Sequence, residues 1–178
     1  AVPEAMERHR PAPVVLDPVM VSTSGARLLE TSALDAMRTR LIPLATLITP
    51  NLPEAELLLD RRIADVAAMH DAIEGLRRLG ARGVLLKGGH LPGSGDVVDL
   101  FADGSQVMAI AHPRLQLEAH GTGCTLAWAV AANLCLGRSL ESSCMAATDY
   151  VHAALRGGYR PGRSNIVVLD HLGAAAHV

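Results

Sequence analysis

Aromatic residues are scarce in this chain, whose 178 residues include one Trp, two Tyr and one Phe. Proteins that bind single-stranded nucleic acid stack bases on aromatic faces, so the scarcity disfavours that class. An excess of one charge is lacking too, because 16 Lys and Arg stand against 18 Asp and Glu, for a formal net charge of -2. The sequence therefore predicts no nucleic-acid partner and no acidic tail for a basic partner.

Paired cysteines and long apolar runs are also missing. The three cysteines form no CxxC motif, and their odd count does not suit the disulfide framework of a secreted protein. The longest apolar stretch, 126–136, is interrupted by Asn133 and is too short to span a bilayer. No signal-peptide pattern opens the chain. We therefore expect a cytoplasmic protein with no membrane partner.

Strand-like and helix-like patterns alternate along the chain without an intervening linker. Continuous apolar strands are typical of parallel sheets covered on both faces. The sequence thus predicts one domain over 1–178, an α/β three-layer α/β/α sandwich with a mainly parallel central sheet. A capping box from Ser32 to Asp35 is expected to open the first helix. Strands are predicted at 14–16, 46–49, 83–87, 97–102, 107–111 and 166–169, and helices at 32–41, 54–59, 66–76, 121–137 and 139–154.

Polar residues follow three of the predicted strands: Asp17, Asn51 and Lys87. Ligands of such sheets bind at the carboxyl ends of the strands, so these side chains are expected around one crevice. Asn51 and Glu54 could hold a hydrated Mg²⁺, and Lys87 could pair with a phosphate. Each also has a structural explanation: Asp17 caps a turn, Asn51 and Glu54 open a helix, and Lys87 is solvated.

The segment Gly121-Thr122-Gly123-Cys124 opens an apolar helix. Glycine backbone and a helix N-terminus together suit an anion such as a phosphate, although a tight turn explains the same glycines. Cys124 lies in the first turn, where the helix dipole favours a thiolate that can act as base or nucleophile.

The other cysteines and the last long helix carry no expected chemistry. Cys135 and Cys144 are expected to be inert packing residues. Asp149 and His152 are expected on a solvated helix face.

Taken in order, these motifs resemble the hydroxymethylpyrimidine and phosphomethylpyrimidine kinases of thiamine biosynthesis, which belong to the ribokinase-like superfamily. A Cys follows Gly-Thr-Gly at position 124, where most of the superfamily has an Asp as base. The resemblance rests on residues 17–21, 24–25, 28–29, 42–46, 48–56, 87–91 and 120–126.

The resemblance implies phosphorylation of hydroxymethylpyrimidine and then of its monophosphate, with ATP and Mg²⁺ as cofactors. Gly121, Thr122 and Gly123 would form the anion hole over the transferred phosphoryl group, with Thr122 and Gly123 contacting ATP. Cys124 would be the catalytic residue beside the substrate hydroxyl.

The resemblance also assigns the residues at the strand ends. Asn51 and Glu54 would orient the hydrated Mg²⁺, and Asn51 and Lys87 would contact ATP. Asp17 would act at the metal and at the substrate, and Val19 would line the pyrimidine pocket. A homodimer is expected on this resemblance alone.

The family begins with a Gly-rich segment that supplies the first strands and part of the substrate pocket, and no such segment precedes Val14. We therefore expect an incomplete sheet with an exposed edge. Three other functions stay open: a pyridoxal kinase, a truncated relative that binds nucleotide without turnover, and a hydrolase using Cys124 with His120.

Overall fold

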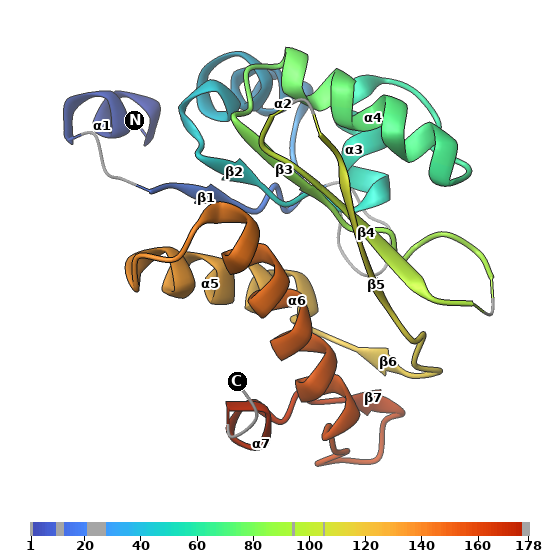
Figure 1. Cartoon of the computed structure of the whole chain (residues 1–178). Helices are drawn as coiled ribbons and strands as arrows, with labels where there is room; N and C mark the ends of the chain where they lie inside the picture. Colours follow the sequence, from blue (N-terminus) through green and yellow to red (C-terminus); the bar gives the residue numbers. More distant parts are fainter. Residues whose placement is uncertain (1, 10–12, 21–27, 94, 105, 176–178) are drawn as a thin grey trace.

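The computed structural model describes residues 2–9, 13–20, 28–93, 95–104 and 106–175. Its central sheet has five strands in the order of the sequence (Figure 1). The first three strands pair in parallel and β4 is antiparallel to both of its neighbours, so within this sheet β4 alone is reversed. The expected mainly parallel sheet is thus confirmed. The strands are β1 (Val15–Leu16), β2 (Leu47–Ile48), β3 (Gly83–Leu86), β4 (Val97–Ala102) and β5 (Met108–His112).

Helices cover both faces of the sheet and make the expected three layers (Figure 1). One face packs on α2 (Thr31–Ala36), α3 (Leu52–Leu59) and α4 (Val66–Arg78), and the other packs on α5 (Thr122–Cys135) and α6 (Leu140–Arg156). Side chains of β3 alternate between the two cores, with Val84 and Leu86 on one side and Leu85 on the other. Because both faces are covered, the five strands are mostly apolar, with Asp99 on β4 and His112 on β5 as the exceptions.

The first predicted helix begins differently from the expectation. Glu30 is its N-cap and its side chain makes no capping bond, so Ser32 lies inside the first turn and the expected capping box is wrong. The chain then continues through the π-helical η1 (Met37–Leu41) and the 3₁₀ turn η2 (Ile42–Leu44) rather than stopping before Pro43. Pro43 is accommodated because the first residues of a helical turn need no N–H donor.

Four short elements complete the described chain. The predicted strand at 166–169 is confirmed at its start, where β7 (Ile166–Val167) pairs in parallel with an unpredicted β6 (Glu118–Ala119). Helices α1 (Val2–His9) and α7 (His171–Ala175) were also not predicted. None of the described helices is long and apolar enough to cross a membrane.

The expected exposed edge corresponds to β1, which pairs with β2 and lies at one end of the sheet order. Residues 24–25, part of the family resemblance, lie outside the described residues. That residues 1–178 form a single domain stays a prediction.

Candidate active site

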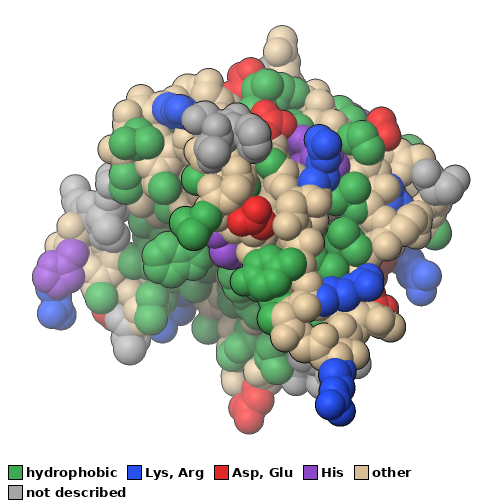
Figure 2. Space-filling view, turned by 90° about the horizontal axis from the view of Figure 1, so that it is seen from below, with side chains coloured by type: hydrophobic (Ala, Val, Ile, Leu, Met, Phe, Trp, Pro, Cys, Tyr) green, Lys and Arg blue, Asp and Glu red, His purple; other side chains and the backbone are tan. Residues whose placement is uncertain are grey.

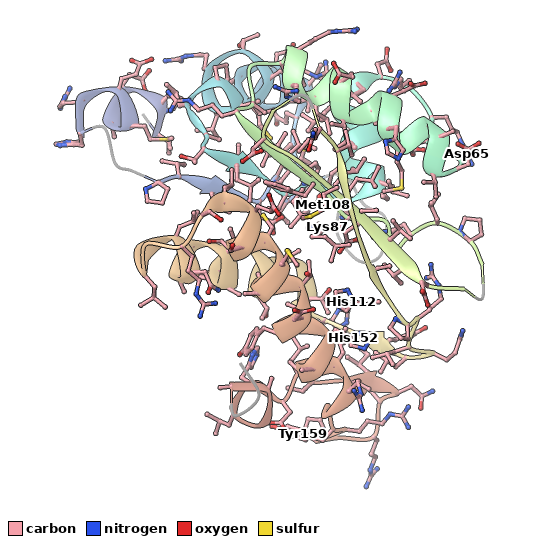
Figure 3. The ribbon with its side chains drawn as sticks, viewed as in Figure 1. Asp65, Lys87, Met108, His112, His152 and Tyr159 are labelled. Carbon is pink, nitrogen blue, oxygen red and sulfur yellow. The ribbon has the colours of Figure 1, made fainter. Side chains whose placement is uncertain are left out.

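The carboxyl ends of β1, β2 and β3 meet, as the sequence predicts. Asn51 and Lys87 form a parallel bridge beyond the ends of β2 and β3, and the Lys87 N–H donates to the Pro50 carbonyl oxygen at 2.9 Å. The Lys87 side chain points to the junction between the sheet and the layer of α5 and α6 (Figure 3). Its Nζ lies 3.1 Å from Oδ1 of Asp17, which follows β1. Residues from three strand ends are thereby brought together.

Asp17 is held by two donors. Its Oδ1 accepts hydrogen bonds from Thr49 Oγ1 at 3.0 Å and from Lys87 Nζ at 3.1 Å. The side chains of Lys87 and Asp17 are 15% and 13% exposed, so the pair is largely shielded from water. Sequence reasoning missed Thr49; the signal was a hydroxyl residue directly after a buried strand and before Pro50-Asn51.

The N-terminus of α5 lies against this ion pair. Gly121 is the N-cap with φ 81, and the helix begins at Thr122. A Cβ added at Gly123 would lie 2.9 Å from Lys87 Nζ and 3.7 Å from Asp17 Oδ2. The first-turn N–H groups of a helix have no intrahelical acceptor, and their partial positive charge attracts anions. An ammonium and a helix N-terminus therefore converge on one point that is suited to a phosphate.

Asn51 and Glu54 form the reciprocal cap of α3. Asn51 Oδ1 accepts from the Glu54 N–H at 2.9 Å, and Glu54 Oε2 accepts from the Asn51 N–H at 2.8 Å. The structural explanation of this pair is thus confirmed. Glu54 is 3% exposed, and its burial raises the pKa of the carboxyl group, against the hydrogen bond from Asn51 and the charge of Lys87.

The oxygen donors fit a hydrated Mg²⁺. The described residues contain no group of three or more His, Cys, Asp or Glu side chains arranged to hold a metal. Mg²⁺ keeps several waters and binds proteins through one or two carboxylates, so a smaller set suits it. The cap uses one carboxylate oxygen of Glu54, and Asp17 adds a second carboxylate beside Lys87. Asp17, Asn51 and Glu54 are therefore chemically suited to this ion.

A cavity of about 850 Å³ opens beside Lys87. This volume lies within the range of small-molecule sites. Its lining includes Asn51, Lys87, Thr122 and Gly123 of the expected site. Its apolar lining includes Leu115, Leu117, Leu126, Val151, Leu155 and Ile166.

Five of the expected site residues do not line this cavity: Asp17, Val19, Glu54, Gly121 and Cys124. Cys124 occupies the first turn of α5 as expected, but it is exposed and outside the lining. Val19 is 46% exposed and also lies outside the lining. His120, the partner of Cys124 in the alternative hydrolase interpretation, does line the cavity.

The two remaining cysteines differ in their exposure to solvent. Cys144 is buried, as predicted, whereas Cys135 is exposed and the prediction that it packs in the interior is wrong. An apolar neighbourhood in sequence does not tell which side of a helix meets the core.

Sequence reasoning missed several polar groups of the cavity wall. His112 on β5 and His152 on α6 stack with ring centroids 4.9 Å apart (Figure 3), and His112 Nε2 lies 2.8 Å from Asp149 Oδ1. Asp149 is exposed, as expected, but His152 lines the cavity and its pKa is lowered by burial and by His112. Asp99 on β4 lines the cavity as well. Pairing of β4 with β5 was the signal that could have placed Asp99 beside His112.

Comparisons with known proteins agree with this architecture. A family model described as phosphomethylpyrimidine kinase matches residues 1–169. The chain is 44% identical over 179 residues to the thiamine biosynthesis bifunctional protein ThiED of Geobacter sulfurreducens, covering 100% of this chain and 36% of that protein. It is 45% identical over 161 residues to the hydroxymethylpyrimidine/phosphomethylpyrimidine kinase of Streptomyces coelicolor, covering 90% of this chain and 59% of that one.

Solved structures show the same fold. The pyridoxal kinase of Staphylococcus aureus in complex with AMP-PCP and pyridoxal superposes with a TM-score of 0.87 at 30% identity, over 99% of this chain and 63% of that one. This likeness makes the fold ribokinase-like. In each comparison this chain spans less than two thirds of its relative's length. Because the family model covers nearly the whole sequence and the curated relatives are well above 30% identical, the chain belongs to the phosphomethylpyrimidine kinase family.

Proposed function

We propose that this chain carries the phosphoryl-transfer site of a kinase that uses ATP and Mg²⁺ to phosphorylate hydroxymethylpyrimidine and its monophosphate. The observation that carries the proposal is the position of Lys87 Nζ, which lies at the N-terminus of α5 beside Gly123 and is paired with Asp17. Phosphoryl transfer requires mainly positioning and neutralisation of charge on the phosphoryl oxygens. The site offers an ammonium and free helix N–H groups for that purpose.

The proposed roles follow from this placement. The N–H groups at Gly121, Thr122 and Gly123 bind the transferred phosphoryl group as charge develops on it, and Lys87 pairs with the ATP phosphates. The substrate hydroxyl attacks the γ-phosphorus, ADP leaves, and Cys124 receives the hydroxyl proton. Cys124 is exposed in this structure, so substrate is expected to approach from the outer side of the α5 N-terminus.

Asp17, Asn51 and Glu54 are the proposed holders of the hydrated metal. Bound Mg²⁺ would supply further charge neutralisation on the phosphate oxygens. Glu54 is fixed by its reciprocal cap with Asn51, and Asp17 by Thr49 and Lys87, so these oxygens are already oriented. Such preorganisation lowers the reorganisation needed during transfer.

The relatives favour a pyrimidine over pyridoxal. The curated relatives with 44% and 45% identity are named for thiamine biosynthesis and for the pyrimidine kinase, whereas the pyridoxal kinase compared above is 30% identical. Pyridoxal is the second candidate substrate because that enzyme superposes over 99% of this chain. We propose that Asp17 and Val19 contact the substrate. The homodimer and the cytoplasmic location stay predictions from the sequence.

The decisive experiment measures ADP release from Mg·ATP with hydroxymethylpyrimidine, its monophosphate and pyridoxal in parallel. We expect turnover of both pyrimidines to exceed that of pyridoxal. Lys87→Ala removes the charge at the anion site and should lower kcat/KM by about 10²–10³-fold. Arg82→Ala, which removes an exposed cation just before β3, is the control and should leave kcat/KM unchanged.

Two other results would contradict this function. Equal or greater turnover of pyridoxal would make the chain a pyridoxal kinase. Binding of ADP without turnover of any of the three substrates would make it a nucleotide-binding relative rather than a kinase.

A further inference from the structure

The backbone after Lys87 leaves the sheet in a way that isolates one N–H group. β3 pairs with β4 as far as Leu86, which lies opposite Leu100. Lys87 bonds to the neighbour on the other side, since successive residues of an inner strand bond to alternate neighbours: it bridges Asn51 and donates to the Pro50 carbonyl. Gly88, the next residue, is buried, so its N–H needs a partner within the protein.

Asp99 is that partner. Its Oδ1 accepts from the Gly88 N–H at 2.8 Å, across a separation of 11 residues. The contact depends on a close approach of the two segments, because a Cβ added at Gly88 would lie 1.9 Å from the Val98 carbonyl oxygen. A glycine backbone pressed against β4 and a carboxylate from β4 together hold the turn that follows Lys87.

Asp99 also interacts electrostatically with the site. It lies on the same face of β4 as Phe101, toward α5 and α6, and it lines the cavity. Burial raises the pKa of its carboxyl group, while the Gly88 N–H and the charges of His112 and Lys87 oppose that rise. Both Asp17 and Asp99 therefore act on Lys87, one by direct contact and the other through the backbone and by charge.

We propose that Asp99 is a positioning residue. By holding the Gly88 N–H it fixes the turn from Lys87 to Gly89, and so keeps the Lys87 ammonium at the N-terminus of α5. The consequence for catalysis rests on the proposed kinase function, but the position of the ammonium does not.

The chain offers a direct measurement of that position, because Lys87 is its only lysine. Acetylation by acetic anhydride, followed by quantification of the Lys87 peptide, reports the reactivity of this amine alone. Asp99→Ala removes the acceptor, and loss of a hydrogen bond to a charged group should raise the acetylation rate about tenfold. Asp99→Asn keeps a carbonyl oxygen for Gly88 and should stay near the rate of the unchanged chain.

Two further variants distinguish a specific effect on the position of Lys87 from a loss of folding or a general effect of removing a carboxylate. Asp103→Ala removes an exposed carboxylate at the other end of β4 and should leave the rate unchanged. Asp99→Val also lacks the acceptor but suits a strand, and it replaces Asp99→Ala if that variant does not fold. Circular dichroism at the labelling temperature confirms which variants are folded.

Kinetics then test the consequence. Asp99→Ala should raise the KM for ATP, Asp99→Asn should largely restore it, and Asp99→Ala should add nothing in the Lys87→Ala background. If a folded Asp99→Ala or Asp99→Val acetylates at the original rate, or if Asp99→Asn behaves like Asp99→Ala, the positioning role is wrong. Absence of turnover in the unchanged chain would instead contradict the kinase function, and the acetylation rates would still decide the role of Asp99.

Discussion

Glu54 illustrates how one buried carboxyl group serves two purposes. It caps α3 through the Asn51 N–H, and it is the best shielded of the proposed metal holders. Lys87 and Asp17 are the charged groups that act on it, one lowering and the other raising its pKa, and burial outweighs both. The same burial that orients the carboxylate therefore makes its ionisation costly in the absence of a cation.

Replacing Glu54 should change how stability depends on pH. Because the pKa of Glu54 in the folded chain is raised above its ordinary value of 4.5, its contribution to stability is complete below that value. The contribution is lost as the pH rises through the raised pKa. Glu54→Gln, which still offers an oxygen to Asn51, should flatten this part of the Tm profile in buffer containing EDTA. The measurement is Tm by differential scanning fluorimetry from about pH 4 to about pH 8.

The control for this prediction is Glu74→Gln, which changes an exposed glutamate on α4. It should leave the profile as it is in the unchanged chain. An equally steep fall in Tm with and without Glu54 would mean that another group causes the pH dependence.

The three thiols should differ sharply in reactivity. Burial raises the pKa of Cys144 to about 12, and its side chain packs between α6 and the sheet. Cys124 and Cys135 are exposed on α5. We therefore expect an aromatic disulfide reagent near neutral pH to modify two thiols in the folded chain and the third only after unfolding. Rapid modification of Cys144, identified by peptide mapping, would contradict the placement of α6.

At the scale of the element, Gly123 at the N-terminus of α5 lowers the stability of the helix but leaves space for the Lys87 side chain. Gly123 lies in the first helical turn, where Ala would be the better helix former by about 1 kcal/mol. The added Cβ would, however, come within 2.9 Å of Lys87 Nζ and displace the ammonium. Glycine at this position therefore favours the approach of Lys87 over the stability of the helix.

Gly123→Ala should thus separate stability from activity. We expect an unchanged or slightly higher free energy of unfolding in urea, together with a KM for ATP raised by about tenfold. Ala132→Gly, at an exposed position of the same helix, is the matched control and should lower stability by about 1 kcal/mol without changing KM. Loss of stability in Gly123→Ala, with normal kinetics, would show that the contact with Lys87 is not functional.

Most elements of the sheet could be predicted because their cause is local. The segment 83–86 is buried on both faces, and 97–102 is apolar apart from Asp99 and pairs with strands on both sides, so each pattern reflects its local surroundings. The start of α2 could not be predicted from Ser32, because the N-cap is set by where the backbone turns and not by the nearest hydroxyl. β6 has two residues, too few for a periodic signal, whereas α1 has eight, as many as the predicted α3, and its helical pattern was overlooked.

The residues of the candidate site also fall into those that the sequence predicts and those that it does not. Asp17, Asn51 and Lys87 could be found because each follows a strand that is recognisable in the sequence. The carboxyl ends of parallel strands lie at one edge of the sheet, which brings the three residues together. Thr49 and Asp99 were missed because their roles arise from contacts across strands, although the place of Thr49 after a buried strand and the pairing of β4 with β5 were available signals. Asp99 in particular looks like an ordinary residue of an antiparallel strand until Gly88 is brought against it.

At the scale of the whole molecule, the outer layer formed by α5 and α6 carries much exposed apolar surface. Hydrophobic side chains gather on the face shown in Figure 2, which is seen from below the view of Figure 1. Among the exposed residues on these helices and at the end of α5 are Trp128, Leu136 and Met145, at 78%, 76% and 44%. A homodimer is expected from the family resemblance. This apolar surface and the edge strand β1 are the places where a second copy of the chain would bind.

Trp128 is the only tryptophan, so fluorescence reports directly on this surface. An indole exposed to this extent should emit at long wavelength and be readily quenched by acrylamide, and unfolding in urea should shift its emission little. Trp128→Ser should change the free energy of unfolding by less than about 0.5 kcal/mol, because the side chain lies mostly in water. A blue-shifted emission that turns red on dilution would instead show that a second copy covers α5, and analytical ultracentrifugation over the same concentrations would show the dimer dissociating. A blue-shifted emission independent of concentration would contradict the exposed position of Trp128.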